Sequence, residues 1–201
     1  GITAVELMPV TEFDEIMMSS SGSSFHNAKQ EPTGYVNYWG YGPSYLYAVK
    51  TAYASRETMS AEGEFKTLVK ELHKAGIECI PEMYFTGKEL PGEILSVLRY
   101  WVEEYHVDGF HLTGFPDLSL AAEDPFLKRT KLFAENWNEV MNRRPKQGYV
   151  TPGDGAVSVE EKNLAEYNMQ FMEDMRRFLK GDEGMLSAFE LRNRRNPMEY
   201  A

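Results

Sequence analysis

The sequence predicts an α/β fold in which about five parallel strands alternate with flanking helices. Short apolar segments of strand character recur between segments of helical periodicity, which is typical of βα units on a parallel sheet. The chain has 201 residues, 42% of them hydrophobic, and this suits one globular domain with a sizeable core. No internal repeat or linker divides the sequence, so we expect a single domain over residues 1–201.

The first sixty residues predict one strand and then a long irregular segment. Ile2–Val10 is short and apolar, and Pro9 stops it as a strand. A loop is expected from about Thr11 to Ser60, and loops of this length inside a domain are usually functional or disordered. Its second half is rich in aromatic residues around Tyr35–Pro43, and we expect these rings to be packed.

Two helices and three strands are predicted in the middle of the chain. The first helix is capped at Gly76, and its apolar residues recur at helical spacing: Phe65, Leu68, Val69 and Leu72. Pro91 opens the second helix, whose apolar face carries Ile94, Leu98, Trp101 and Tyr105. The expected strands are Ile77–Phe85, Gly109–Thr113 and Thr130–Glu135.

A third helix is predicted near the C-terminal end of the sequence. Ser158 and Glu161 match a capping box, and Gly181 follows the last apolar residue. The apolar face of this helix is expected to carry Leu164, Tyr167, Phe171, Met175 and Phe178. A short helical turn is expected over Met185–Phe189.

The charge of the chain restricts its partners. A net charge of −10 and a pI near 5.0 argue against nucleic acid and anionic membranes, and they fit a cytoplasmic protein that meets a neutral ligand. Cys79 is the single cysteine and cannot form an internal disulfide. No apolar run approaches the roughly 20 residues that span a bilayer.

The sequence predicts no metal and no cofactor. The histidines lack metal-ligand spacing with carboxylates or cysteine: His26, His73 and His106. The acidic residues that could suggest calcium are too scattered: Asp14, Asp154 and Asp182.

Several runs in the right order resemble one enzyme family. Asn37–Tyr41 (NYWGY), Leu98–Phe110 (LRYWVEEYHVDGF), Thr130–Trp137 and Phe171–Gly184 are similar to motifs of the α-amylase superfamily of glycoside hydrolases (family 13). The likeness is greatest to its isoamylase, pullulanase and glycogen-debranching members. It implies an incomplete (β/α) TIM-barrel-like domain that contains the second to sixth strand units of the catalytic barrel. We therefore expect the chain to be a piece of a longer ancestral design.

The resemblance also implies an altered active site. Tyr41 matches the tyrosine that stacks on the sugar ring at the cleavage site, and Glu135 matches the acid/base. His111 and Thr113 stand where the family has arginine and the nucleophilic aspartate. Where the family has aspartate, asparagine and histidine around the third strand, this chain has Glu82, Thr86 and Gly87.

The substituted nucleophile predicts a degenerate, non-hydrolytic domain. Retaining glycosidases need two carboxyl groups about 5–5.5 Å apart, and the neutral hydroxyl of Thr113 cannot replace one of them. The alternative is an active α-1,6-glucosidic hydrolase, in which Glu135 is the acid/base and Asp117 or Glu82 is a relocated nucleophile. Whether the chain is an enzyme is therefore open from the sequence.

The aromatic loop is the main candidate for ligand binding. Aromatic rings match the C–H faces of glucose, and the dense set here is Tyr38, Trp39, Tyr41, Tyr45 and Tyr47. These rings either bind α-glucan weakly or form an aromatic plug over one end of the barrel. His111 either donates to a sugar hydroxyl or is a satisfied core histidine. A partial barrel has open strand edges, so we also expect self-association and, with it, a structural or assembly role. A further alternative is that the chain is a fragment with no independent role.

Overall fold

We describe the chain from a computed structural model. The structure describes residues 1–19, 31–55, 60–114, 116–118, 120–134, 163–167 and 169–181. The chain divides into two compact units, Gly1–Leu132 and Phe133–Ala201, and each is described by itself. The single domain over residues 1–201 stays a prediction.

The central element is a five-stranded sheet in the order β1-β6-β7-β8-β9. These strands are β1 (Ala4–Leu7), β6 (Glu78–Phe85), β7 (Gly109–Gly114), β8 (Lys131–Ala134) and β9 (Leu164–Glu166). β1 pairs with β6, and β6 with β7, in parallel. β8 begins in the first unit and ends in the second. The α/β fold with about five strands is therefore confirmed.

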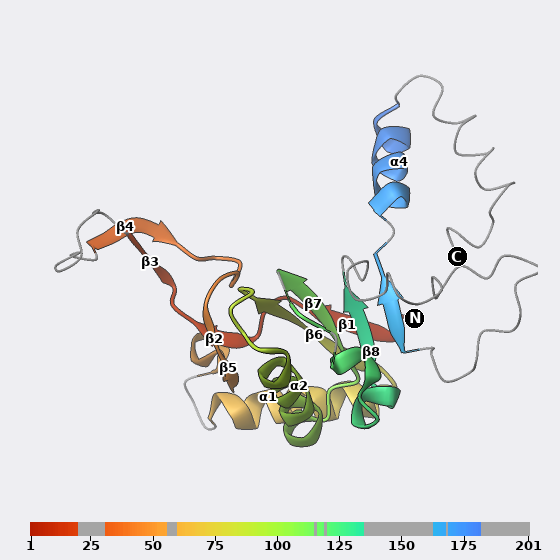
Figure 1. Cartoon of the computed structure of the whole chain (residues 1–201), viewed down its shortest axis with the longest axis horizontal. Helices are drawn as coiled ribbons and strands as arrows, with labels where there is room; N and C mark the ends of the chain where they lie inside the picture. Colours follow the sequence, from red (N-terminus) through yellow and green to blue (C-terminus); the bar gives the residue numbers. More distant parts are fainter. Residues whose placement is uncertain are drawn as a thin grey trace, which may run out of the picture. The chain divides into compact units, whose positions relative to one another are not determined.

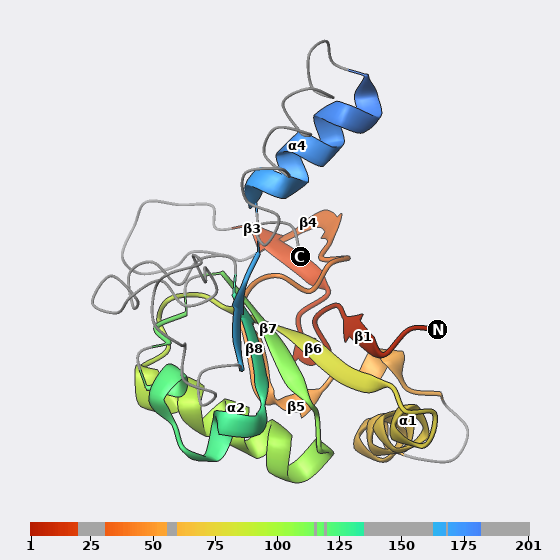
Figure 2. The same cartoon turned by 90° about the vertical axis from the view of Figure 1, so that its right-hand side faces the viewer.

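Two helices pack on one side of the strands in the first unit (Figures 1 and 2). In α1 (Ala61–Lys74), the Ser60 side chain caps the first turn by accepting from the Gly63 amide, and Gly76 follows the helix at φ +70°. α2 (Pro91–Tyr105) begins with proline at its first position, where no amide hydrogen is needed. Both predicted helices are confirmed.

The two faces of the sheet differ in chemistry because neighbouring side chains of a strand point to opposite sides. Fully buried apolar side chains alternate along β6, β7 and β8: Cys79, Met83, Phe85, Phe110, Leu112 and Leu132. The polar side chains of these strands occupy intervening positions: Glu78, Glu82, Tyr84, His111, Thr113 and Lys131. We call the second set, with Glu6 of β1, the polar face.

The prediction of an irregular segment from Thr11 to Ser60 was wrong. Four strands and a 3-10 turn lie there: β2 (Thr11–Phe13), β3 (Ile16–Ser19), β4 (Glu31–Val36), β5 (Ser44–Val49) and η1 (Thr51–Tyr53). β2 pairs with β5, and β3 with β4, both antiparallel and both with an irregular register. Such short, bulged strands leave little period-two alternation in the sequence, so local patterning does not reveal them.

The second unit corrects the third predicted helix. Leu164–Glu166 is the strand β9, and the helix α4 begins at Met169 and ends at Lys180. The amide of Tyr167 donates to the carbonyl of Ala134 at 3.1 Å, so this stretch pairs with β8 and does not form a helix. Gly181 follows the helix at φ +82°, as predicted. The expected capping box at Ser158 and the turn at Met185–Phe189 lie outside the described residues.

Candidate functional site

The candidate site lies on the polar face, at the carboxyl ends of β6 and β7. Glu82 is in register with His111, and Tyr84 with Thr113, so these side chains share one side of the sheet. Glu82, His111 and Thr113 are only 5%, 9% and 6% exposed. Buried polar groups at the carboxyl ends of parallel strands are typical of functional sites in barrel folds.

Thr113 holds a buried, neutral hydroxyl at this edge. Within the described ranges, its Oγ1 has no hydrogen-bond partner and is shielded from solvent. A threonine becomes a nucleophile only when an adjacent base takes its proton, and the described residues supply no such base in contact with Oγ1. The next residue, Gly114, lies at φ +81° so close to β6 that a Cβ would come within 2.2 Å of the Phe85 carbonyl oxygen.

His111 is held by Glu6. The imidazole Nδ1 lies 2.7 Å from Glu6 Oε1, although Glu6 is on β1 and His111 on β7, with β6 between them. Glu6 is half-exposed and His111 is nearly buried, so the contact connects the interior to the surface. The ring is therefore oriented by a carboxylate. Its role toward a sugar hydroxyl stays a prediction.

Tyr41 reaches the same site from the aromatic loop. Its hydroxyl donates to Glu82 Oε2 at 3.2 Å, and its ring centroid lies 5.6 Å from that of Tyr84, with the rings tilted by 57°. The side chain stays 45% exposed. The structure thus brings together Tyr41 and Glu82, which are far apart in the sequence.

The turn before Tyr41 is fixed by the side chain of Asn37. Its Oδ1 accepts from the Gly40 amide at 3.0 Å, and its Nδ2 donates to the Tyr41 carbonyl at 3.0 Å. The Asn37 amide also donates to the Glu15 carbonyl at 2.7 Å. Gly40 lies at φ +80°, where a Cβ would meet the Phe13 ring at 2.8 Å, so this position requires glycine.

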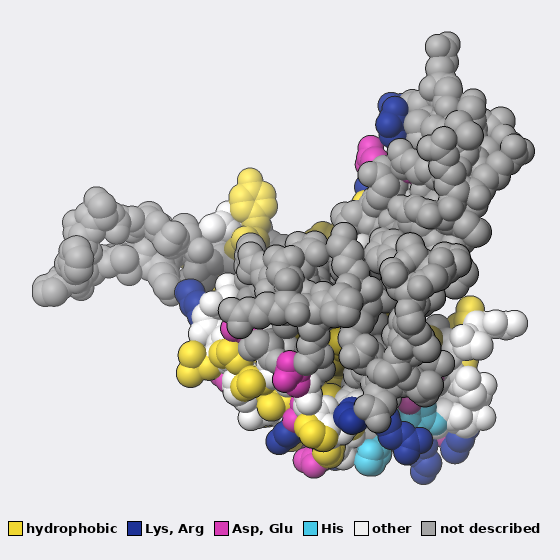
Figure 3. Space-filling view, turned by 45° about the vertical axis from the view of Figure 1, so that its right-hand side comes forward, with side chains coloured by type: hydrophobic (Ala, Val, Ile, Leu, Met, Phe, Trp, Pro, Cys, Tyr) yellow, Lys and Arg dark blue, Asp and Glu magenta, His cyan; other side chains and the backbone are white. Residues whose placement is uncertain are grey.

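The aromatic half of the loop is exposed, which contradicts the expectation that it packs. Tyr38 is 75% exposed and Trp39 56%, and the two rings form an edge-to-face pair at 5.3 Å. Tyr45 is exposed as well, while Tyr47 stays partly accessible against the ring of Tyr100. Hydrophobic side chains reach the surface over the described part of the chain (Figure 3). The rings lie outside because short two-stranded pairs have too few neighbours to cover them.

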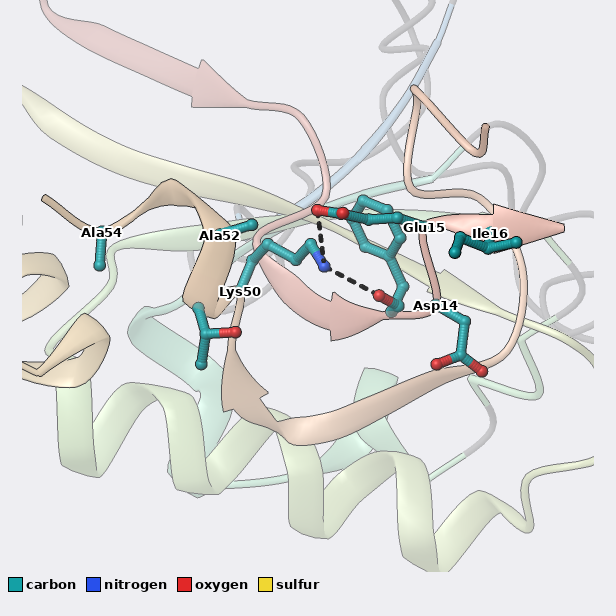
Figure 4. A pocket seen from close by; sticks show the side chains of 8 residues that line it. Asp14, Glu15, Ile16, Lys50, Ala52 and Ala54 are labelled. Carbon is teal, nitrogen blue, oxygen red and sulfur yellow. Dashed lines mark hydrogen bonds and ion pairs between the residues drawn. The ribbon is translucent and has the colours of Figure 1, made fainter. Parts of the chain in front are cut away.

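A buried lysine holds the base of this loop. Lys50 Nζ contacts Glu12 Oε1 at 2.7 Å. It also contacts the Phe13 carbonyl at 2.9 Å and Glu15 Oε1 at 3.2 Å (Figure 4). Burial raises the pKa of Glu12, but hydrogen bonds from Lys50 and Thr51 outweigh it and hold that pKa at about 2. Burial lowers the pKa of Lys50, and its two carboxylate partners raise it above its ordinary value.

This cluster borders an open pocket of about 690 Å³. Asp14, Ile16, Ala52 and Ala54 complete its lining (Figure 4). Sequence reasoning missed Lys50, because a lysine after an apolar strand usually faces solvent. It also missed Glu6 and Tyr84. The alternation of side chains along β1 and β6 could have identified them, because it places both residues on the polar face.

The comparisons with known proteins agree with this arrangement. No family model matches the chain. It is 30% identical to isoamylase 3, chloroplastic, of Oryza sativa subsp. japonica, over 96% of this chain and 31% of the rice protein. It is 28% identical to a glycogen debranching enzyme of Serratia proteamaculans, over 100% of this chain and 37% of that enzyme.

The chain is a relative of the isoamylases and glycogen-debranching enzymes. It spans about a third of the length of these relatives. The alignment with the rice isoamylase covers 263 positions, more than the 201 residues of this chain, so the rice protein has segments without a counterpart here. This relationship confirms the family resemblance.

One solved pullulanase structure shares the fold. A variant of the pullulanase from Paenibacillus barengoltzii, complexed with maltotriose, matches with a TM-score of 0.50. The match has 15% sequence identity and covers 87% of this chain and 32% of the pullulanase. This likeness bears on the fold and agrees with the partial barrel that the sequence predicts.

The remaining predicted residues of this debranching-enzyme relative fall in different places. Glu135 lies outside the described residues, so its role as acid/base stays a prediction. Asp117 is exposed on the segment after β7. Burial raises the pKa of the Cys79 thiol to about 12, which leaves it a poor nucleophile.

Two searches cover only the described part of the chain. Among those residues, no three histidine, cysteine or acidic side chains are grouped as a metal site requires. None of the helices described is both long enough and apolar enough to cross a bilayer.

Proposed function

We propose that this chain is an α-glucan-binding domain that has lost the hydrolytic step of its debranching relatives. The observation that carries the proposal is Thr113: a buried, uncharged hydroxyl occupies the position that the resemblance assigns to the nucleophile. A hydroxyl cannot stabilise an oxocarbenium ion as a carboxylate does, and no described group is in place to deprotonate it.

The binding half of the proposal rests on the exposed aromatic rings around Tyr41, whose hydroxyl bonds Glu82 on the polar face. Tyr41, Tyr38 and Trp39 are each about half-exposed or more, and their turn is held by Asn37. Exposed rings of this kind suit the flat apolar faces of glucose, and a neutral ligand meets no repulsion from a chain of net charge −10. Weak binding is expected, because the loop covers a sugar from one side only.

Titration with maltoheptaose, followed by tryptophan fluorescence, tests the proposal. We expect saturable quenching or enhancement with the full chain, and no release of reducing ends from glycogen or pullulan. Trp39→Phe should reduce the signal, since Trp39 is exposed while Trp101 is fully buried. Tyr41→Ala should abolish binding, while the matched control Tyr53→Ala, an exposed tyrosine on η1, should not.

A second candidate is an active α-1,6-glucosidic hydrolase with a relocated nucleophile. Glu82 favours it, because this buried carboxylate lies on the same side of the sheet as Thr113 and contacts Tyr41. Asp117 fits less well because it is exposed. Release of glucose oligomers from pullulan that both Glu82→Gln and Glu135→Gln abolish would establish this function and overturn the first.

We also propose that the chain self-associates, as a structural or assembly role requires. β1 lies at the end of the sheet order, and among the described strands only β6 pairs with it. An unpaired strand edge is a template for another chain. A strict monomer by light scattering at high concentration would contradict self-association.

If maltoheptaose is neither bound nor cleaved, two alternatives remain for this chain. It then has a structural role, or it is a fragment with no independent role. A cytoplasmic location stays a prediction.

A further inference from the structure

We propose that Glu82 is a positioning residue that holds the ring of Tyr41 ready for a sugar. This inference rests on the proposed glucan binding and adds a residue to it. Nothing in the resemblance assigns this task to Glu82, which there only matches the position of an aspartate.

The geometry of Tyr41 carries the first step. Its backbone is fixed by the Asn37 side chain, which bonds the Tyr41 carbonyl at 3.0 Å. Its hydroxyl donates to Glu82 Oε2 at 3.2 Å, and one side of its ring meets Tyr84 at 5.6 Å. The ring is thus held at its base and at its tip, and the remaining 45% exposure leaves surface for a ligand.

The burial of Glu82 carries the second step. Its side chain is 5% exposed, so a ligand reaches it poorly, whereas Tyr41 is accessible. A hydrogen bond in a buried setting is stronger than one in water, because the surrounding dielectric constant is low. Glu82 and Tyr84 are two residues apart on β6, so one rigid strand provides both contacts to the ring.

Holding the ring in place has a measurable consequence for binding. An exposed tyrosine samples several rotamers, and fixing one of them on binding costs free energy. The hydrogen bond from Tyr41 to Glu82 already fixes the ring in the unbound protein, so this cost does not arise on binding. Loss of that hydrogen bond should therefore weaken maltoheptaose binding by about two- to tenfold, although the ring itself stays present.

A double-mutant cycle on the full chain tests the inference, with maltoheptaose as the probe. Tyr41→Phe keeps the ring and removes the hydroxyl, and Glu82→Leu removes the acceptor; each should weaken binding by about two- to tenfold. The double variant should bind no more weakly than either single variant. Glu82→Gln keeps an acceptor oxygen and should bind within about twofold of the wild type.

Each other outcome has a defined meaning. If the affinity losses of the two single variants multiply in the double variant, Glu82 acts independently of the Tyr41 hydroxyl, and the inference is overturned. Tyr41→Phe that binds like the wild type would also overturn it, even if Glu82→Leu fails to fold. If neither the wild type nor Tyr41→Ala binds, the proposed function itself fails. Glu103→Leu, at an exposed position on α2, is the matched control and should not change the affinity.

Discussion

His111 on β7 bonds Glu6 on β1 across the intervening strand β6, with 2.7 Å between Nδ1 and Oε1. Lys131 on β8 likewise contacts Glu78 on β6 past Gly109 of β7, which has no side chain to block the approach. Both pairs lie on the polar face. They join alternate strands, so charged side chains stabilise the face opposite the helices.

The first prediction concerns the Glu6–His111 contact. Glu6→Ala should lower the free energy of unfolding by about 1–2 kcal/mol, because the nearly buried imidazole loses a charged partner. Glu71→Ala should change it by less than about 0.5 kcal/mol, because Glu71 pairs with Lys74 on an exposed helix surface. Urea unfolding at pH 7 measures both values. Equal losses in the two variants would show that the contact is no stronger than a surface pair.

The second prediction concerns the hydroxyl of Thr113. Thr113→Val should leave the unfolding free energy unchanged or raise it by up to about 1 kcal/mol, because a buried polar group without a described partner is replaced by a methyl group. Thr113→Asp should lower it at pH 7, since a second carboxylate is then buried near Glu82. Chemical denaturation distinguishes the two. A marked loss in the valine variant would mean that Oγ1 makes a stabilising bond in the folded chain.

The fold was predictable where it depends on local patterning. Phe65 and Val69 recur at helical spacing and face the core, and both helices follow from such positions. The pairing of β2 with β5 was not predictable, because its partners Glu12 and Tyr45 are far apart in the sequence and the register is irregular. Leu164 fits a helical pattern, but pairing with β8 decides in favour of a strand.

The same distinction applies to the candidate site. Motif resemblance identified Tyr41 and Thr113, since each lies in a contiguous run that can be compared. It did not reveal that Tyr41 bonds Glu82 or that Glu6 orients His111, because these contacts join distant segments. The burial of Lys50 was equally hidden, because two carboxylates that only folding assembles compensate its charge.

The third prediction concerns acid and Glu12. Its folded pKa of about 2 lies below the ordinary 4.5, so its contribution to stability is complete above pH 4.5 and is lost as the pH falls toward 2. The contribution is of the order of 3 kcal/mol. Glu12→Gln should therefore destabilise the protein at pH 7 and much less at pH 3. Urea unfolding at both pH values tests this, and an equal difference at the two would rule out ionised Glu12 as the cause.

The fourth prediction concerns the close approach of β6 and β7. Gly114→Ala should lower the free energy of unfolding by more than about 2 kcal/mol, because the new Cβ would meet the Phe85 carbonyl and φ is +81°. Gly92→Ala, on α2 with open space around it, should be neutral or slightly stabilising. Thermal unfolding of the two variants gives the comparison. Similar melting temperatures would argue against the tight contact at Gly114.

The most direct test of the central claim is an assay of reducing-end release from pullulan by the full chain, run alongside maltoheptaose binding. The loss of a carboxylate at Thr113 predicts saturable binding with no release above that of a heat-denatured sample. Release that Glu135→Gln abolishes would contradict the account, because it would mean that another group attacks the sugar.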